Sequence, residues 1–201
     1  MKKILFLSLF SFITIIGFTQ ELRNDNNFVE LVNLKIEFVN QILINFKGDL
    51  KNLTDFQSEM EKMSNEEKID FFNSKVKLPE GKDLTYYANA FNEKWIILKN
   101  TYEDRITNEY LTEEISFLLN ESNSKLAPLD LGGELGVGIG PCDRPKMFAG
   151  CTAAAYAGAL ICHGGCLTTT LAVFACFAAC GTLEAWAIVA CHDTYCTPKA
   201  N

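Results

Sequence analysis

The cysteine residues constrain this chain more than any other feature of its sequence. None of the first 141 residues is a cysteine, and the eight that the chain contains are Cys142, Cys151, Cys162, Cys166, Cys176, Cys180, Cys191 and Cys196. An even number of cysteines in one short segment is typical of a disulfide framework, which forms in oxidising compartments. The sequence therefore predicts that all eight form disulfides and that the protein is exported.

The N-terminus has the layout of a secretory signal. Lys2 and Lys3 precede an apolar run from Ile4 to Ile16, which as a helix would be about 20 Å long and too short to span the roughly 30 Å hydrocarbon core of a bilayer. Small residues follow, so we predict a signal peptide at 1–19 with Thr19 and Gln20 flanking the cleavage point. The alternative is an uncleaved anchor; the prediction is a secreted, extracellular protein.

Charge divides the chain into two chemically different parts. Residues 20–130 contain 13 Lys and Arg against 21 Asp and Glu, a net charge of −8, whereas residues 141–201 contain three of each. A basic face of the kind that binds nucleic acid is absent, so no nucleic-acid partner is expected.

The acidic part shows helical periodicity throughout. Apolar residues recur at helical spacing over 28–46, 53–63 and 84–102, a capping-box sequence at Ser64 starts another short helix, and a last helix begins near Thr112. We therefore predict an all-α, bundle-like region over 20–130. This region has no Cys and no His, and we identify no catalytic residues, no cofactor site and no metal site in it.

A glycine-rich linker follows at 131–141. Five of the nine residues from Gly132 to Gly140 are glycine, a composition that does not hold a helix. Proteases cut such segments readily, and Gly132 and Gly133 are the candidate processing residues.

The cysteine-rich segment, 142–201, is predicted to be a small helical module stapled by disulfides. Residues 147–183 contain no charged side chain and many alanines, which favours helices. With breaks at 163–165 and Gly181, the expected helices lie near 147–162, 166–180 and 182–192. A module of this size buries little apolar surface, and disulfides of about 2–4 kcal/mol each would make up the difference.

The cysteine pairing is less constrained. In the three-helix arrangement Cys151 lies opposite Cys176, and Cys180 pairs with the last helix. The nearly palindromic gaps between cysteines suggest nested pairs instead, but these require a Cys166–Cys176 bond, and a continuous helix would hold those residues about 15 Å apart. Either the middle helix is broken or the pairs are not nested.

This segment also allows three other interpretations. Cys162, His163 and Cys166, or Cys191, His192 and Cys196, could bind zinc through thiolate and imidazole groups. The uncharged stretch that begins before Leu167 is long enough to cross a bilayer. Cys191 and His192 could form a catalytic pair, although adjacent side chains diverge. The disulfide framework is preferred over all three, so the protein is not expected to be an enzyme.

The cysteine-rich segment resembles a known family of peptides. The sequence Tyr156-Ala157-Gly158, followed by Cys162, Cys166, Cys176, Cys180, Cys191 and Cys196, is similar to that of halocin-type cysteine-rich bacteriocins and of precursors related to fulvocin-type bacteriocins. The resemblance covers about residues 141–201. It implies an exported precursor in which an N-terminal part serves in producer immunity.

The resulting functional hypothesis is a secreted, bacteriocin-like antimicrobial precursor. Its expected partners are the target-cell membrane, its own acidic pro-region, and the signal and processing proteases. The alternative is a non-enzymatic interaction module that stays attached to the helical N-terminal region for life, which predicts no cleavage in 131–141.

Overall fold

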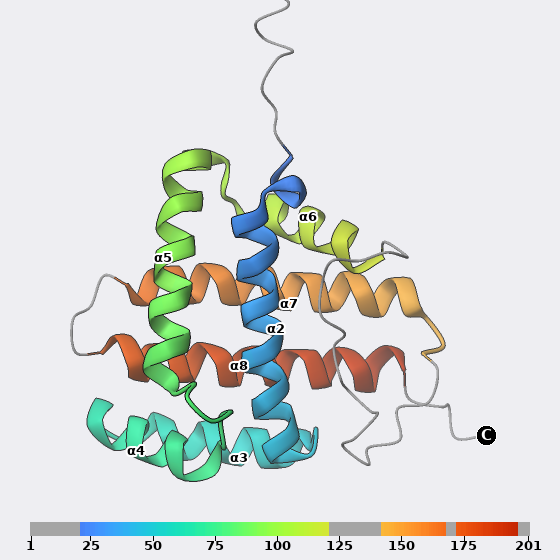
Figure 1. Cartoon of the computed structure of the whole chain (residues 1–201). Helices are drawn as coiled ribbons and strands as arrows, with labels where there is room; N and C mark the ends of the chain where they lie inside the picture. The colour runs from blue at the N-terminus through green and yellow to red at the C-terminus, as the bar shows by residue number, and fades with distance from the viewer. Residues whose placement is uncertain (1–20, 121–141, 168–171, 197–201) are drawn as a thin grey trace, which may run out of the picture.

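The computed structural model describes residues 21–120, 142–167 and 172–196, and every regular element in these ranges is helical (Figure 1). The predicted signal peptide, the glycine-rich linker and the processing residues Thr19, Gln20, Gly132 and Gly133 lie outside the described residues. The α-helices are α2 (Asn26–Phe46), α3 (Leu50–Glu61), α4 (Asn65–Lys75), α5 (Leu84–Tyr102), α6 (Asn108–Asn120), α7 (Pro145–Cys166) and α8 (Val173–Tyr195). Short 3₁₀ turns lie at Leu22–Asn24 and Glu103–Arg105.

The helices of the acidic part begin and end where local chemistry requires it. The backbone at Lys47 and Gly48 is left-handed and ends α2, and the Asp49 side chain then accepts the Asn52 amide at the start of α3. Ser64 and Glu67 form the predicted capping box of α4, each side chain accepting the other residue's backbone N–H.

The apolar periodicity predicted over 84–102 corresponds to the buried face of α5. Seven residues of that helix, from Leu84 to Tyr102, are buried. One helix start was wrong: α6 begins at Asn108 rather than near Thr112, because the Thr107 hydroxyl accepts the Tyr110 amide and starts the helix a turn earlier.

The cysteine-rich part forms two long helices rather than the three that we predicted. Helices α7 and α8 run side by side as an antiparallel pair, hereafter the hairpin (Figure 1). His163, Gly164 and Gly165 lie inside α7 and Gly181 lies inside α8, so neither expected break exists. Helix α7 instead continues to Cys166, and α8 begins at Val173.

Close packing explains why two of these glycines lie inside helices. A Cβ atom at Gly164 would lie 2.5 Å from the Trp95 ring, and one at Gly181 would lie 2.4 Å from the Phe38 ring. Both glycines thus allow an aromatic ring of the acidic part to pack directly against the backbone of the hairpin. In the sequence they read as helix breakers; in the fold they are contact points.

Helices α2 to α6, hereafter the cover, pack against the hairpin. Helices α2 and α5 cross the hairpin, α3 and α4 pack along α8, and α6 packs along α7 (Figure 1). Buried residues of both parts form one hydrophobic core. At its centre the Phe38 ring lies 5.9, 5.0 and 5.3 Å from those of Phe72, Tyr87 and Phe177, spacings typical of favourable aromatic pairs.

Candidate functional site

Four nested disulfides join the two helices of the hairpin along their length. They are Cys142–Cys196, Cys151–Cys191, Cys162–Cys180 and Cys166–Cys176, and the described residues include no free cysteine. The expectation that all eight cysteines form disulfides agrees with this arrangement. Three pairs link facing positions of the two antiparallel helices, and Cys142–Cys196 joins the chain just before α7 to the chain just after α8. The hairpin is therefore held together covalently whether or not the cover is present.

The expected pairing was wrong in its details. Cys151 pairs with Cys191 rather than Cys176, and Cys180 pairs back to α7 rather than with a later cysteine. The error came from the misplaced helix break. Since the chain reverses between Cys166 and Cys176, their Cα atoms lie 5.6 Å apart instead of about 15 Å, and the nested order suggested by the palindromic gaps becomes possible.

The disulfides also bear on the chemistry of the cysteines. The sulfur atoms of Cys166, Cys176 and Cys180 lie within 4.8 Å of one another, but each is bonded to another sulfur. Zinc ligands and catalytic nucleophiles are thiolates. The geometry of this cluster is therefore that of two adjacent disulfides.

A buried polar cluster lies between the cover and the hairpin. Lys35 of α2 places its Nζ atom 2.5 Å from Glu184 Oε2 of α8 and 3.2 and 3.3 Å from the two ring nitrogens of His163 in α7. The Tyr156 hydroxyl, also buried, interacts electrostatically with Glu184. All four residues are at most 2 % exposed, a degree of burial that is rare for Lys and Glu unless they are paired.

Hydrogen bonds fix the His163 ring within this cluster. Its Nδ1 atom lies 2.7 Å from the Ala159 carbonyl, one turn earlier in α7, and its Nε2 atom lies 3.1 Å from the Phe177 carbonyl of α8. A neutral imidazole carries one N–H, so one ring nitrogen donates to a carbonyl while the other can accept from the Lys35 ammonium. The ring therefore connects all three helices.

Burial dominates the titration behaviour of the cluster in the folded chain. Burial lowers the pKa of Lys35, and the adjacent Glu184 carboxylate opposes that change. Burial raises the pKa of Glu184 to about 7 despite the Lys35 ammonium. The pKa of His163 is held well below its ordinary value by burial and by Lys35, which keeps the imidazole neutral.

The sequence did not reveal this cluster, although two signals were present. Lys35 falls at a core position of the α2 periodicity, in step with Phe28, Val32 and Val39. Glu184 is an isolated acid in a long apolar helix. A charged residue at a core position of one helix and an opposite charge alone in another are the pattern that a buried ion pair leaves in a sequence.

The hairpin has a groove on its solvent-facing side. A hollow of about 290 Å³ runs between α7 and α8, lined mainly by small residues of α7, by Leu183 and Ala187, by Glu184, and by the Cys162–Cys180 disulfide. The neighbouring exposed position Ile161 is also apolar, whereas Trp186 donates from its ring nitrogen to the Thr54 hydroxyl of α3. The residues that line the groove are thus uncharged except for Glu184, which is buried.

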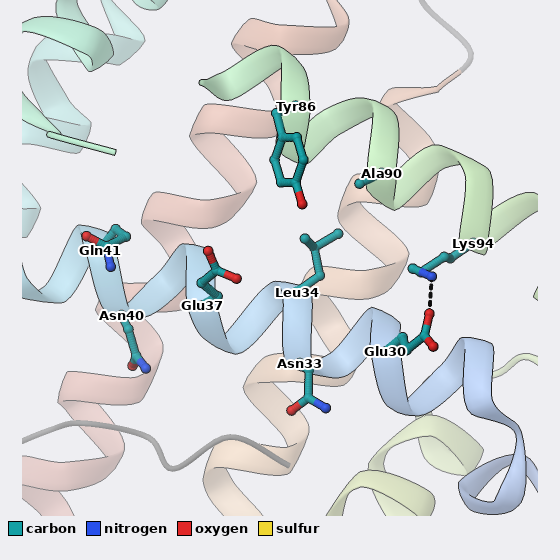
Figure 2. A pocket seen from close by; sticks show the side chains of 9 residues that line it. All are labelled: Glu30, Asn33, Leu34, Glu37, Asn40, Gln41, Tyr86, Ala90 and Lys94. Atoms are coloured by element: carbon teal, nitrogen blue, oxygen red, sulfur yellow. Dashed lines mark hydrogen bonds and ion pairs between the residues drawn. The ribbon is translucent and has the colours of Figure 1, made fainter. Parts of the chain in front are cut away.

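A larger hollow of about 410 Å³ lies on the outside of the cover, between α2 and α5 (Figure 2). Figure 2 shows Tyr86 of α5 and Leu34 of α2 pointing toward each other across it. Glu30 pairs with Lys94 at one end, and Glu37 accepts hydrogen bonds from Lys82 Nζ (2.6 Å) and the Tyr87 hydroxyl (2.7 Å). The charged residues that line this hollow therefore have partners within the fold, and the hairpin remains the better candidate site.

Both hairpin helices are long and apolar enough to cross a membrane by length and composition, and 39 % and 56 % of their most apolar windows are buried within the fold. Core helices of soluble proteins can have the same properties. Comparisons of the chain with protein-family models, with curated proteins and with solved structures gave no match.

Proposed function

We propose that the chain is the precursor of a secreted, bacteriocin-like antimicrobial peptide, whose active part is the α7–α8 hairpin and which acts on target membranes without enzymatic chemistry. One observation carries the proposal: two apolar helices of membrane-crossing length are fixed side by side by four disulfides that involve no residue of the cover.

The disulfides favour a hairpin that works after separation from the cover. Links between the two halves of a precursor would have to be broken on release, whereas links within the hairpin survive cleavage of the backbone. Disulfides in the described chain also point to an oxidising compartment. Secretion through the predicted signal peptide accounts for such a compartment.

The cover has the properties expected of an inhibitory or protective partner. It buries one side of the hairpin, where Ala157, Leu160 and Ile188 belong to the common core. Lys35 supplies the positive charge that Glu184 would otherwise lack. Cleavage in the proposed processing segment, 131–141, would leave the cover bound to the hairpin only by non-covalent contacts.

The same core supports a second candidate, a non-enzymatic interaction module that remains attached to its cover. The rings of Phe38 and Phe177 and the Lys35–Glu184 pair join the two parts as intimately as the interior of one domain. In this alternative the outer groove of the hairpin would contact a partner, and the backbone would stay intact from the signal cleavage point to Asn201.

The test is the mass of the secreted product together with its effect on vesicles. A peptide that begins between Leu131 and Pro141 and gains eight mass units on reduction would show release of a four-disulfide hairpin. We expect that peptide to cause release of dye from vesicles of phosphatidylethanolamine and phosphatidylglycerol. The same peptide after reduction and alkylation should cause less release. An intact secreted chain without vesicle leakage would favour the interaction module.

A further inference from the structure

The hairpin carries a polar stripe inside its otherwise apolar helices. Thr152, Tyr156 and His163 lie on α7 at helical spacing, and Glu184 lies at the midpoint of α8, eleven residues from either end. All four side chains are buried. The contacts of Lys35 with both His163 and Glu184 show that the stripe faces α2 of the cover.

The folded chain leaves much of this stripe without hydrogen bonds. The Thr152 and Tyr156 hydroxyls and Glu184 Oε1 have no hydrogen-bond partner among the described residues. A buried polar group without a partner is unfavourable, and folded proteins usually avoid such groups. These groups would recover hydrogen bonds if the stripe faced water, as the lining of a conducting path does.

The opposite side of the hairpin is suited to apolar contact. Ala154, Gly158 and Cys162 recur every four residues on the outer side of α7, and Ile161 extends the apolar surface. Small residues at this spacing allow helices to approach closely within a bilayer. If hairpins associated through this surface, the apolar side of each hairpin would face lipid and neighbouring hairpins. The polar stripe would then lie on the opposite side of each hairpin.

The only charge that the polar stripe can carry near neutral pH is the negative charge of Glu184, because His163 is neutral. From Met147 to Cys196 the only Asp or Glu residues are Glu184 and Asp193, and there is no Lys or Arg. Separation from the cover would remove Lys35 and leave the Glu184 carboxyl in the middle of the helix. An ionisable group at that depth marks an ion path in membrane proteins, and acidic groups in pores favour cations.

We propose that the separated hairpin conducts small monovalent cations through a bilayer, with the Glu184 carboxylate as the group that selects them. This inference rests on the membrane activity proposed above. In the precursor, Lys35 occupies the position of the cation, and the cover blocks the stripe.

The experiment uses the full chain with a specific protease site placed in 131–141, cleaved after folding and applied to planar bilayers of phosphatidylethanolamine and phosphatidylglycerol. The K35M/E184Q chain removes both charges of the buried pair, so that no unpaired charge prevents the precursor from folding. Because Lys35 lies in the cover, the released hairpin of this variant differs from wild type only at position 184. The D193N chain is the matched control, because it removes an acid of α8 that lies exposed near the end of the helix.

We expect the wild-type and D193N hairpins to pass K⁺ over Cl⁻ by about tenfold or more, and the K35M/E184Q hairpin to lose most of that preference. Conductance with equal selectivity in all three chains would overturn the role of Glu184 and leave the proposed membrane activity standing. A wild-type hairpin with verified disulfides that neither conducts nor leaks dye would overturn both proposals.

Discussion

The buried pair between Lys35 and Glu184 gives the sharpest test of how the cover holds the hairpin. We compare the wild-type chain with K35M, E184Q and the K35M/E184Q double variant. Each single change leaves one member of the pair without its partner in a site that is nearly inaccessible to solvent. The double change replaces both charged groups with neutral side chains of similar length.

The distances set the expected magnitudes. At the Nζ–Oε2 separation of 2.5 Å, the attraction is about 7 kcal/mol with an effective dielectric constant of about 20. Removing two ions from water costs several kcal/mol each, so the pair as a whole contributes little. Losing Glu184 alone leaves a buried ammonium and should cost about 3–5 kcal/mol.

K35M should cost less than E184Q near neutral pH. Burial already raises the pKa of Glu184 to about 7, and without the Lys35 ammonium that pKa should rise further. The carboxyl can therefore become neutral by taking up a proton, which limits the penalty. The double variant should lie within about 1 kcal/mol of wild type or above it, because no unpaired charge remains.

The measurement is guanidinium unfolding of the oxidised chains, followed by circular dichroism and by tryptophan fluorescence, with coincident curves as the test of two-state behaviour. The double variant should be more stable than E184Q by at least about 2 kcal/mol. Single variants within about 0.5 kcal/mol of wild type, with additive effects in the double variant, would refute a buried ion pair between the cover and the hairpin.

Three further predictions follow from the same geometry. G181A should lower the free energy of unfolding by about 1–3 kcal/mol, because its Cβ would meet the Phe38 ring. The control G158A, whose Cβ meets nothing within 4 Å, should be neutral or stabilising by up to about 1 kcal/mol. Equal effects of the two substitutions in urea unfolding would contradict the close contact at Gly181. C151A/C191A should lower the free energy of unfolding by about 2–4 kcal/mol, while peptide mapping shows the other three disulfides intact. Reshuffled cysteine pairs in this variant would refute the expectation that each disulfide forms independently of the others. Because the folded pKa of Glu184 is raised from 4.5 to about 7, its contribution to stability is present below pH 4.5 and lost as pH rises through 7. The stability of K35M/E184Q, measured by unfolding across this pH range, should lack this loss. If K35M/E184Q shows the same dependence of stability on pH as wild type, the loss belongs to other groups.

The sequence predicted the helical class and much of the cover, because local signals determine these features. Apolar periodicity located α5, and the Ser64 capping box located the start of α4. Such signals depend on neighbouring residues and are readable without the rest of the fold. The start of α6 was missed by one turn because the Thr107 cap was overlooked.

The hairpin was predicted less well because distant contacts decide it. Gly164 and Gly181 remain helical where rings of Trp95 and Phe38 press against the backbone, and that tertiary contact outweighs the low helix propensity of glycine. Once these glycines were treated as breaks, the three-helix arrangement and the wrong cysteine pairs followed. The buried cluster was missed because Lys35 lies 128 residues from His163 in the chain.

The nested cross-links also determine the order in which the framework can be completed during synthesis. The paired cysteines are separated by 10, 18, 40 and 54 residues from the innermost pair outward, and closing the outermost loop alone costs about 1.5 kcal/mol more in chain entropy than closing the innermost. Cys142 leaves the ribosome first among the cysteines and must wait for Cys196, the last. An oxidant that joined thiols in order of emergence would link Cys142 to Cys151, so correct maturation requires either a zipper that closes from the turn outward or an isomerase that corrects early mistakes.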